Sequence, residues 1–341
     1  MENSDKFINE FVPRVSRTFS LAMQFLPERL RRSINSAYLL CRLIDTIEDS
    51  PRIQSVDKIS RLKYLNSLHK SYSAGRILHI SDYDNFFESL DLDESLDHKL
   101  LSEYRILFEI IEKLPLSHRN IIYRWSAEMA EGMAEYVELK QEPGCSVVTL
   151  NDLKDWDRYC YYVAGTVGQM LTELFIEELQ FTENEISALI SHSNSFGLGL
   201  QKVNTIKDIP GDRERGIIYI PLEIIARHSL HPDSLNNPAY AENIAALARE
   251  LVNLARNHLD DAIEYTKIIP ESENGIRMFL IVPIFLAVET LIHIYGNPVQ
   301  AICGPPVKIS RTDVVRLTSQ AAFCSTSNKK LVEYYQNLKK F

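Results

Sequence analysis

Glycine and cysteine are both scarce in this chain, and no long hydrophobic run is present. The 341 residues include 12 glycines and 5 cysteines, although 45% of the residues are apolar. Long stretches of alternating apolar and polar residues are rare, which favours helices over a sheet. The longest apolar run, Met278 to Val288, contains Pro283 and is too short to cross a bilayer. The sequence therefore predicts an all-α protein with a sizeable core and no transmembrane segment.

The chain also lacks an excess of positive charge. Its formal net charge is −9, whereas nonspecific binding to nucleic acid requires clustered lysine and arginine. We therefore expect no nucleic-acid partner. Most of the acidic residues are expected to be solvated surface. The acid-rich segment 81–97 is interpreted in the same way, because it lacks the glycine and glutamate that a calcium-binding loop requires.

The cysteines form no C-x-x-C pair, and their number is odd, which indicates reduced core thiols and not a disulfide framework or a zinc site. The polar N-terminal segment shows no signal peptide, and the C-terminal segment shows no hydrophobic tail. We expect a cytoplasmic monomer that is soluble or peripherally associated with a membrane. The sequence also shows no H-E-x-x-H, G-x-S-x-G, P-loop or G-x-G-x-x-G nucleotide motif.

Helical periodicity dominates the chain, and there is no internal repeat or flexible linker, so one domain over residues 1–341 is the simplest interpretation. The most apolar of the predicted helices is expected to be the most central. Six helices are predicted: Leu30–Asp49, Arg119–Leu139, Leu153–Leu179, Glu185–Asp208, Ala239–Ile268 and Gly275–Tyr295.

Two acidic clusters carry most of the chemical information. Asp45 and Asp49 are four residues apart at the end of a predicted helix, and Asp208 and Asp212 have the same spacing. Positions i and i+4 lie on one helical face, about 6 Å apart. Two carboxylates at that distance repel each other unless a cation lies between them. Mg²⁺ suits such oxygens and accepts substrate phosphates as further ligands. The alternative is an ordinary ion-pair lattice on an exposed helix.

The surroundings of the two clusters differ. Arg42 lies one turn before Asp45, where a guanidinium could bind a diphosphate. In the second cluster, Pro210 and Gly211 are expected to end the helix, so that a turn would position Asp212. The glycines in Phe196-Gly-Leu-Gly199 indicate either close helix packing or space for a ligand tail.

A third motif runs from Asp155 to Gly168. Ala164, Gly165 and Gly168 leave a bare strip on a helix, which would accommodate either a second helix or a long apolar substrate. Tyr159 precedes this strip by about one turn. Its ring could stabilise a cation and its phenol could relay a proton, and the alternative is a core tyrosine.

Taken together, these motifs resemble the squalene/phytoene synthase family, and most of all its squalene synthase members. The resemblance spans nearly the whole chain. It is carried by Ser16-Arg-Thr-Phe19, Tyr38-x-x-x-Arg42-x-x-Asp45-Thr-x-Glu48-Asp49, Asp155-Trp-Asp-x-Tyr159-Cys-x-Tyr-Val-Ala-Gly-x-Val-Gly168, Leu200-Gln-Lys-x-Asn204-x-Ile-x-Asp208-x-x-x-Asp212, Phe279-x-x-x-Pro283 and Val307-Lys-Ile309.

The resemblance implies an isoprenoid-synthase helical bundle around a central cavity. It further implies Mg²⁺-dependent, head-to-head condensation of two farnesyl diphosphates to presqualene diphosphate, followed by reduction to squalene with NADPH. Tyr159 matches the tyrosine assigned to proton handling and cation stabilisation.

The resemblance also assigns roles residue by residue. The metal ligands would be Asp45, Glu48, Asp49, Asp208 and Asp212, and Tyr159 joins the aspartates as catalytic. The substrate would contact Ser16, Phe19, Tyr38, Arg42, Val163, Val167, Gly168, Leu171, Gln201, Asn204, Lys207, Arg215, Phe279 and Pro283. The candidates for binding NADPH are Lys202, Asn204, Arg213 and Arg215.

Three positions depart from the family pattern. Lys207 replaces the usual arginine, Gly211 replaces a glutamate, and Ile217 occupies the place of an arginine, with Arg215 nearby. These departures leave two alternatives open. The enzyme could act without reductant and form presqualene diphosphate, dehydrosqualene or phytoene, or the chain could be a non-catalytic helical scaffold.

Overall fold

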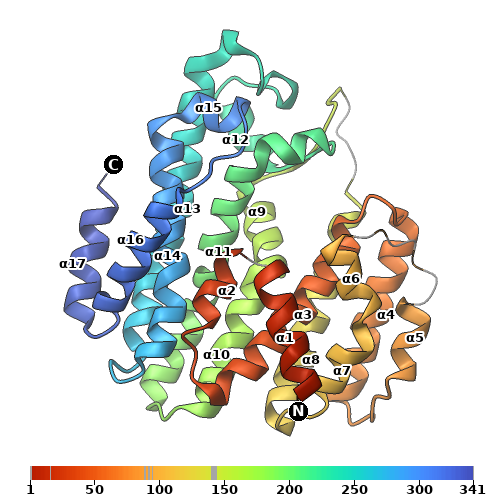
Figure 1. The fold of residues 1–341 in the computed structure, drawn as a ribbon. Helices are drawn as coiled ribbons and strands as arrows, with labels where there is room; N and C mark the ends of the chain where they lie inside the picture. The colour runs from red at the N-terminus through yellow and green to blue at the C-terminus, as the bar shows by residue number, and fades with distance from the viewer. Residues whose placement is uncertain are drawn as a thin grey trace. The chain divides into compact units, whose positions relative to one another are not determined.

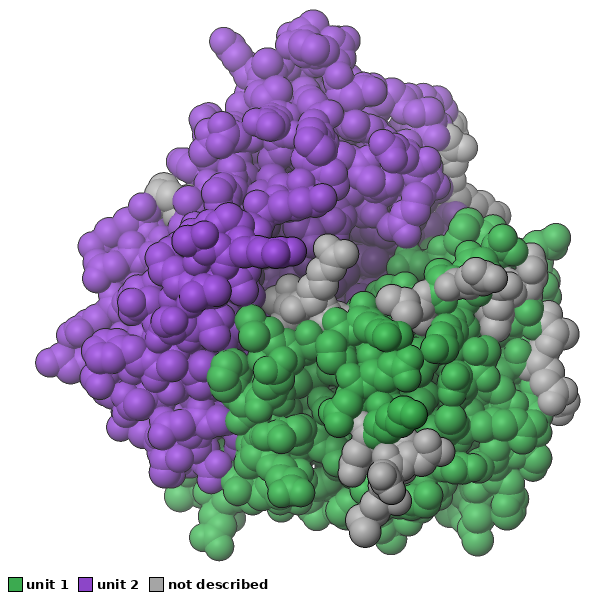
Figure 2. Space-filling view, viewed as in Figure 1, with its two compact units in different colours: residues 1–138, 166–186 green, residues 139–165, 187–341 purple. Residues whose placement is uncertain are grey.

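The computed structural model describes residues 2–15, 17–87, 90, 93, 95–139 and 144–340. The chain divides into two compact units, which Figure 2 shows in different colours. It passes from one unit to the other three times. Unit 1 comprises Met1–Glu138 and Thr166–Ile186, and unit 2 comprises Leu139–Gly165 and Ser187–Phe341. The fold is helical, as the periodicity predicts. The single-domain interpretation stays a prediction.

Unit 1 is built around the helices α3, α4, α8 and α10, which pack against one another (Figure 1). Helix α3 follows Pro27 and ends before Pro51, because a residue that precedes proline avoids the α conformation. The helices of this unit are α1 Glu2–Val15, α2 Arg17–Met23, α3 Glu28–Asp49, α4 Ser55–Ser73, α5 Ser81–Phe87, α6 Leu96–Ser102, α7 Tyr104–Ile111, α8 Leu116–Val137 and α10 Thr166–Glu178.

Unit 2 holds the only sheet in the described part of the chain, a parallel pair in which Val148 lies opposite Ile217. Helix α11, Glu183–Glu214, begins in unit 1 and continues into unit 2. The other elements are β1 Val148–Leu150, α9 Leu153–Cys160, the π-helical turn η1 Tyr161–Gly165, β2 Ile217–Pro221, α12 Leu222–Arg227, the 3₁₀ turns η2 Pro232–Ser234 and η3 Pro238–Tyr240, α13 Ala241–Ile268, α14 Asn274–Gly296, α15 Pro298–Cys303, α16 Arg311–Cys324 and α17 Asn328–Leu338.

Helix α14 forms the core of unit 2 and packs against α13, α15 and α16. Among the described residues it is the one helix with the length and composition to cross a membrane. However, 83% of its most apolar window is buried inside the protein. Its fully buried Arg277 donates hydrogen bonds to the carbonyl oxygens of Thr266, Ile269 and Ser325. This guanidinium thereby connects the ends of α13 and α16 to the core helix.

The six predicted helices correspond to α3, α8, the α9–η1–α10 segment, α11, α13 and α14. Two differences matter for function. A π-helical turn interrupts the predicted helix Leu153–Leu179, and α11 continues past Pro210 to Glu214. The segment 81–97 also differs from a solvated surface, because Tyr83 and Phe86 are buried in unit 1. All five cysteines are thiols, and Cys41, Cys160 and Cys324 are buried, as expected.

Candidate functional site

The first acidic face lies at the C-terminal end of α3. Asp45 is partly buried, with 26% of its side chain exposed, and Asp49 is exposed one turn later. Burial and the neighbouring charge of Asp49 raise the pKa of Asp45 to about 7, against the opposing effect of Arg42. A carboxylate pair under this repulsion gains stability when a divalent cation binds. Repulsion by Asp49 is thus one cause of the raised pKa of Asp45, and the metal site itself stays a prediction.

Arg42 bridges two carboxylates in unit 1. Its Nη1 donates to Asp45 Oδ2 at 2.9 Å, while its Nε and Nη2 donate to the two oxygens of Asp97 at 3.1 and 2.8 Å. These carboxylates raise the pKa of Arg42 in spite of its partial burial. Asp97 holds the guanidinium in a fixed orientation beside the acidic face.

The other predicted residues of unit 1 surround α3. Glu48 is half-buried, and its carbonyl oxygen accepts a hydrogen bond from Lys58. The ring of Phe19 lies 6.1 Å from that of Tyr38, whose hydroxyl donates to the carbonyl of Val15 at 3.5 Å. Ser16 lies outside the described residues.

The second acidic face is a regular helical face, which corrects the prediction of a turn. Helix α11 continues through Pro210, so Asp208 and Asp212 lie four residues apart on the same face. The side chain of Asp208 is 44% exposed and that of Asp212 is 8% exposed. The helix ends at Glu214, and Gly216 in the turn that follows has a φ of +83°, a conformation that glycine adopts readily. Proline removes only one hydrogen bond here, and it does not end the helix.

Basic side chains accompany this face. Lys207 Nζ lies 3.4 Å from Asp208 Oδ2 and 3.4 Å from the Asn204 side-chain oxygen. Arg215 donates to Asp212 at 2.6 Å. Arg213 donates instead to the carbonyl of Ile302 at 3.4 Å. Lys207 and Arg215 are thus placed where they could contact the oxygens of a diphosphate bound at this face.

Tyr159 is buried in unit 2, with 7% of its surface exposed, and stacks on Tyr219 from β2. The two rings are parallel within 7°, with centroids 4.2 Å apart. Helix α9 is fixed to α11 by Trp156, whose indole nitrogen donates to Thr205 at 3.1 Å. The π-helical turn η1 begins two residues after Tyr159, and such turns are frequent at functional sites.

Lys202 is a core residue of unit 2. It is 1% exposed and forms an ion pair with Asp157. Its ammonium lies 4.6 Å from the centroid of the Trp156 ring and 3.1 Å from His258 Nε2. All of these contacts are internal. The predicted contact of Lys202 with NADPH stays a prediction.

The glycines of α11 serve close helix packing, one of the two interpretations that the sequence left open. A Cβ at Gly197 would lie 2.1 Å from the carbonyl oxygen of Ala164, and one at Gly199 would lie 2.8 Å from Leu259. The bare strip around Ala164 is thus occupied, at least in part, by α11.

The remaining residues predicted to contact the substrate differ in burial. Within unit 2, Val163 and Gln201 are half-buried, whereas Phe279 and Pro283 are buried in α14. Within unit 1, Val167 is half-buried and Gly168 and Leu171 are buried.

Sequence reasoning missed several residues around these sites. Asp97 lies in the segment that was interpreted as solvated surface, and Tyr219 lies in a short apolar strand. Asp157 and His258 complete the contacts of Lys202. A tyrosine inside an apolar strand is a weak signal that could have drawn attention to Tyr219. No local pattern indicates the pairing of Arg42 with Asp97.

Comparison with known proteins identifies the family. The family model for squalene/phytoene synthase matches residues 12–313. A squalene synthase of Candida albicans is 28% identical over 96% of this chain and 69% of its own length. A squalene synthase of Schizosaccharomyces pombe is 29% identical over 85% of this chain. The chain spans only 59% of the length of that second relative.

Solved structures share the fold. TcSQS in complex with the ligand E5700 superposes with a TM-score of 0.82 at 22% identity, covering 99% of this chain and 92% of that one. A dehydrosqualene synthase in complex with a ligand gives a TM-score of 0.67 at 20% identity, covering 98% of both chains. The fold is therefore the isoprenoid-synthase helical fold, as expected. The chain belongs to the squalene/phytoene synthase family of prenyltransferases.

Proposed function

We propose that this protein is a squalene synthase. It would condense two farnesyl diphosphates head to head into presqualene diphosphate and then reduce that product to squalene. The proposal is supported by one observation above all. This chain, a member of the family, carries two acidic helical faces, Asp45/Asp49 and Asp208/Asp212, and each face has a basic side chain beside it.

The donor set fits Mg²⁺. All five candidate ligands are carboxylates, the oxygen donors that Mg²⁺ prefers, and the pKa of Asp45 is raised in part by the adjacent charge of Asp49. Asp45, Glu48 and Asp49 would hold metal in unit 1, and Asp208 and Asp212 would hold metal in unit 2. Bound Mg²⁺ would neutralise the charge of the leaving diphosphate.

The basic residues would bind and orient the diphosphates. Arg42 is held beside Asp45 by Asp97, while Lys207 and Arg215 accompany Asp208 and Asp212. Their charge-assisted hydrogen bonds to phosphate oxygens would favour cleavage of the bond between carbon and the diphosphate oxygen.

Tyr159 would act on the hydrocarbon part of the reaction. The allylic carbon of one substrate forms a bond to the 2,3 double bond of the other, and loss of one proton closes the cyclopropane ring. The phenol of Tyr159 would relay that proton, and its ring would stabilise the cation. The stack of Tyr159 on Tyr219 fixes the orientation of the phenol. Apolar residues such as Val163, Val167, Leu171 and Phe279 would exclude water.

The reductive half rests on the family resemblance. NADPH would supply a hydride to the carbon skeleton after the second diphosphate departs. The candidates for contacting NADPH are Lys202, Asn204, Arg213 and Arg215. Of these, Lys202 is paired with Asp157 and lies beside His258. A monomeric state and peripheral membrane contact also stay predictions.

In a second candidate function, the reaction stops before the reduction step. Gly211 and Ile217 replace charged residues of the family pattern, and Arg215 is paired with Asp212. These substitutions favour an enzyme that releases presqualene diphosphate or forms dehydrosqualene or phytoene without reductant. A scaffold that has lost catalysis is less compatible with the retained aspartates.

A product assay distinguishes these functions. The purified chain is incubated with farnesyl diphosphate and Mg²⁺, with and without NADPH, and the products are identified by mass spectrometry. Squalene that forms only with NADPH supports the proposal. Presqualene diphosphate or dehydrosqualene in both conditions supports the second candidate. Absence of turnover in every condition, with the chain folded, contradicts both.

A further inference from the structure

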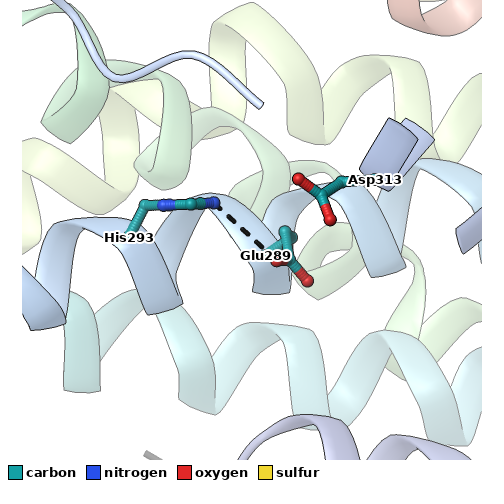
Figure 3. Close-up of side chains that lie close together, drawn as sticks. All are labelled: Glu289, His293 and Asp313. Atoms are coloured by element: carbon teal, nitrogen blue, oxygen red, sulfur yellow. Dashed lines mark ion pairs between the residues drawn. The ribbon is translucent and has the colours of Figure 1, made fainter. Parts of the chain in front are cut away.

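A second group of metal-ligating side chains lies where α14 meets α16, both within unit 2. Glu289 and His293 are four residues apart in the last two turns of α14, and Asp313 lies in the first turn of α16. Figure 3 shows that the three side chains converge. One ligand atom from each lies within 4.8 Å of the ligand atoms of the other two. None of these residues belongs to the proposed diphosphate sites.

Glu289 stands out because it is a buried carboxylate in the most apolar helix of the protein. Its side chain is 11% exposed, and a charge in such a position requires compensation. Arg316 Nη2 supplies part of it, by donating to Glu289 Oε2 at 2.9 Å and to Asp313 Oδ1 at 3.2 Å. One guanidinium therefore serves two carboxylates, and the group retains an excess negative charge.

His293 provides an independent observation. The His293 side chain is 41% exposed, but its Nε2 atom is buried and makes no hydrogen bond to protein. This nitrogen lies 3.7 Å from Glu289 Oε1, which is too long for a hydrogen bond. Arg316 donates hydrogen bonds to Glu289 Oε2 and Asp313 Oδ1, but it makes none with His293 Nε2. Asp313 Oδ2 in turn accepts a hydrogen bond from the Ser310 hydroxyl at 2.6 Å. A cation here would bind His293 Nε2 and Glu289 Oε1 and would share one oxygen of Asp313 with its present donor.

We propose that Glu289, His293 and Asp313 form a site for a Zn²⁺-class divalent ion that connects α14 to the first turn of α16. Imidazole nitrogen with two carboxylates is a donor set suited to Zn²⁺, whereas Mg²⁺ prefers oxygen alone. Ligand atoms up to 4.8 Å apart require a small inward movement of the side chains to reach bonds of about 2 Å. A water molecule would occupy the fourth position.

Among the described residues, the neighbours Cys145 and His231 could also attract Zn²⁺ and must be controlled for. Cys145 Sγ lies 3.5 Å from His231 Nε2, and His231 Nδ1 lies 3.5 Å from Asp233 Oδ2. These side chains are largely exposed, and their distances are those of ordinary polar contacts. His231→Gln therefore serves as the matched control for His293→Gln.

The test measures Zn²⁺ binding to the full chain by equilibrium dialysis in excess Mg²⁺, which saturates the oxygen-only sites. Wild type and His231→Gln are expected to bind one Zn²⁺ with equal affinity. His293→Gln and Asp313→Asn should weaken that binding by at least about 10-fold. Arg316→Gln should tighten it several-fold, because it removes a competing positive charge. Co²⁺ should give visible absorption bands in wild type and Arg316→Gln, but not in His293→Gln.

The gain expected from Arg316→Gln separates a metal site from a loss of folding, because a destabilised variant would bind less metal. Circular dichroism of each variant checks the fold independently. The proposal is overturned if wild type binds no Zn²⁺, if His293→Gln binds it as wild type does, or if Arg316→Gln loses it. Loss of binding in His231→Gln alone would assign the metal to Cys145 and His231 and would equally overturn it.

Discussion

Arg42 and Asp97 form a bidentate ion pair, in which Nε and Nη2 of the arginine donate to the two carboxylate oxygens at 3.1 and 2.8 Å. The same guanidinium donates to Asp45, so Asp97 influences the first acidic face through Arg42 and through its own charge. Asp97 is not one of the proposed metal ligands, and its hydrogen bonds reach Asp45 through Arg42.

We expect Asp97→Asn to lower the pKa of Asp45, which is about 7 in the metal-free wild type. The substitution removes one negative charge and leaves more of the Arg42 charge to Asp45. Arg42→Gln should have the opposite effect and raise this pKa. Carboxyl ¹³C NMR titration without Mg²⁺ measures both changes. Asp93→Asn, an acid of the same segment that pairs with Arg52, is the control. An unchanged pKa of Asp45 in Asp97→Asn would contradict the inferred coupling.

The pairing of Lys202 with Asp157 predicts an asymmetric effect on stability. Asp157→Asn leaves a buried ammonium without its counter-charge and should lower the free energy of unfolding by about 2 kcal/mol or more. Lys202→Met leaves behind a carboxylate whose side chain is 42% exposed although its Oδ1 atom is buried, so a smaller loss of about 1 kcal/mol is expected. Urea unfolding of both variants measures the difference. A larger loss in Lys202→Met than in Asp157→Asn would refute this account of the pair.

Two glycines of α11 should respond in opposite directions to alanine. A Cβ at Gly211 would meet open space, so Gly211→Ala should stabilise the protein by about 1 kcal/mol through helix propensity. A Cβ at Gly197 would collide with the Ala164 carbonyl at 2.1 Å, so Gly197→Ala should destabilise it by about 1–3 kcal/mol. Thermal unfolding of the two variants provides the comparison. If Gly211→Ala were destabilising, the helical continuation through Pro210 would be in error.

Buried His69 predicts a loss of stability in acid. Desolvation lowers its pKa from 6.5 to about 3, and its Nδ1 lies 2.8 Å from the Ser126 hydroxyl. Between these pKa values the unfolded chain binds a proton that the folded chain does not. Stability should therefore decrease as the pH falls from 6.5 towards 3, by up to about 1.4 kcal/mol per pH unit from this group.

Denaturant unfolding at several pH values tests this effect. His69→Gln should flatten the pH dependence, whatever it does to absolute stability, and His79→Gln, which removes an exposed histidine, should leave the slope unchanged. Equal slopes in wild type and His69→Gln would show that His69 is not buried in its neutral form.

Local sequence patterns predict those features that depend only on the spacing of residues along one helix. The Asp45/Asp49 face follows from an i,i+4 spacing in a helix whose apolar positions are regular. The end of α11 could not be read in the same way. A proline permits a helix to continue when the following residues keep helical dihedral angles, and here the helix ends at Glu214, before the turn in which Gly216 has a φ of +83°.

Contacts between segments that are far apart in the sequence could not be predicted from local patterns. Asp97 lies 55 residues from Arg42, and Tyr219 reaches Tyr159 only because β2 follows the end of α11. Lys202 illustrates the same limit, because no local pattern indicates its contacts with Asp157, Trp156 and His258. Tertiary packing determines each of these contacts, and no repeating pattern in the sequence indicates them.

The most direct test of the central claim is Mg²⁺-dependent binding of a farnesyl thiodiphosphate, an analogue that ionises poorly, measured by calorimetry. Wild type should bind it tightly with Mg²⁺ and weakly after chelation, and Asp45→Asn and Asp208→Asn should each lose the Mg²⁺-dependent part while remaining folded. Binding that is indifferent to Mg²⁺, or unaffected in both variants, would contradict the assignment of the two acidic faces.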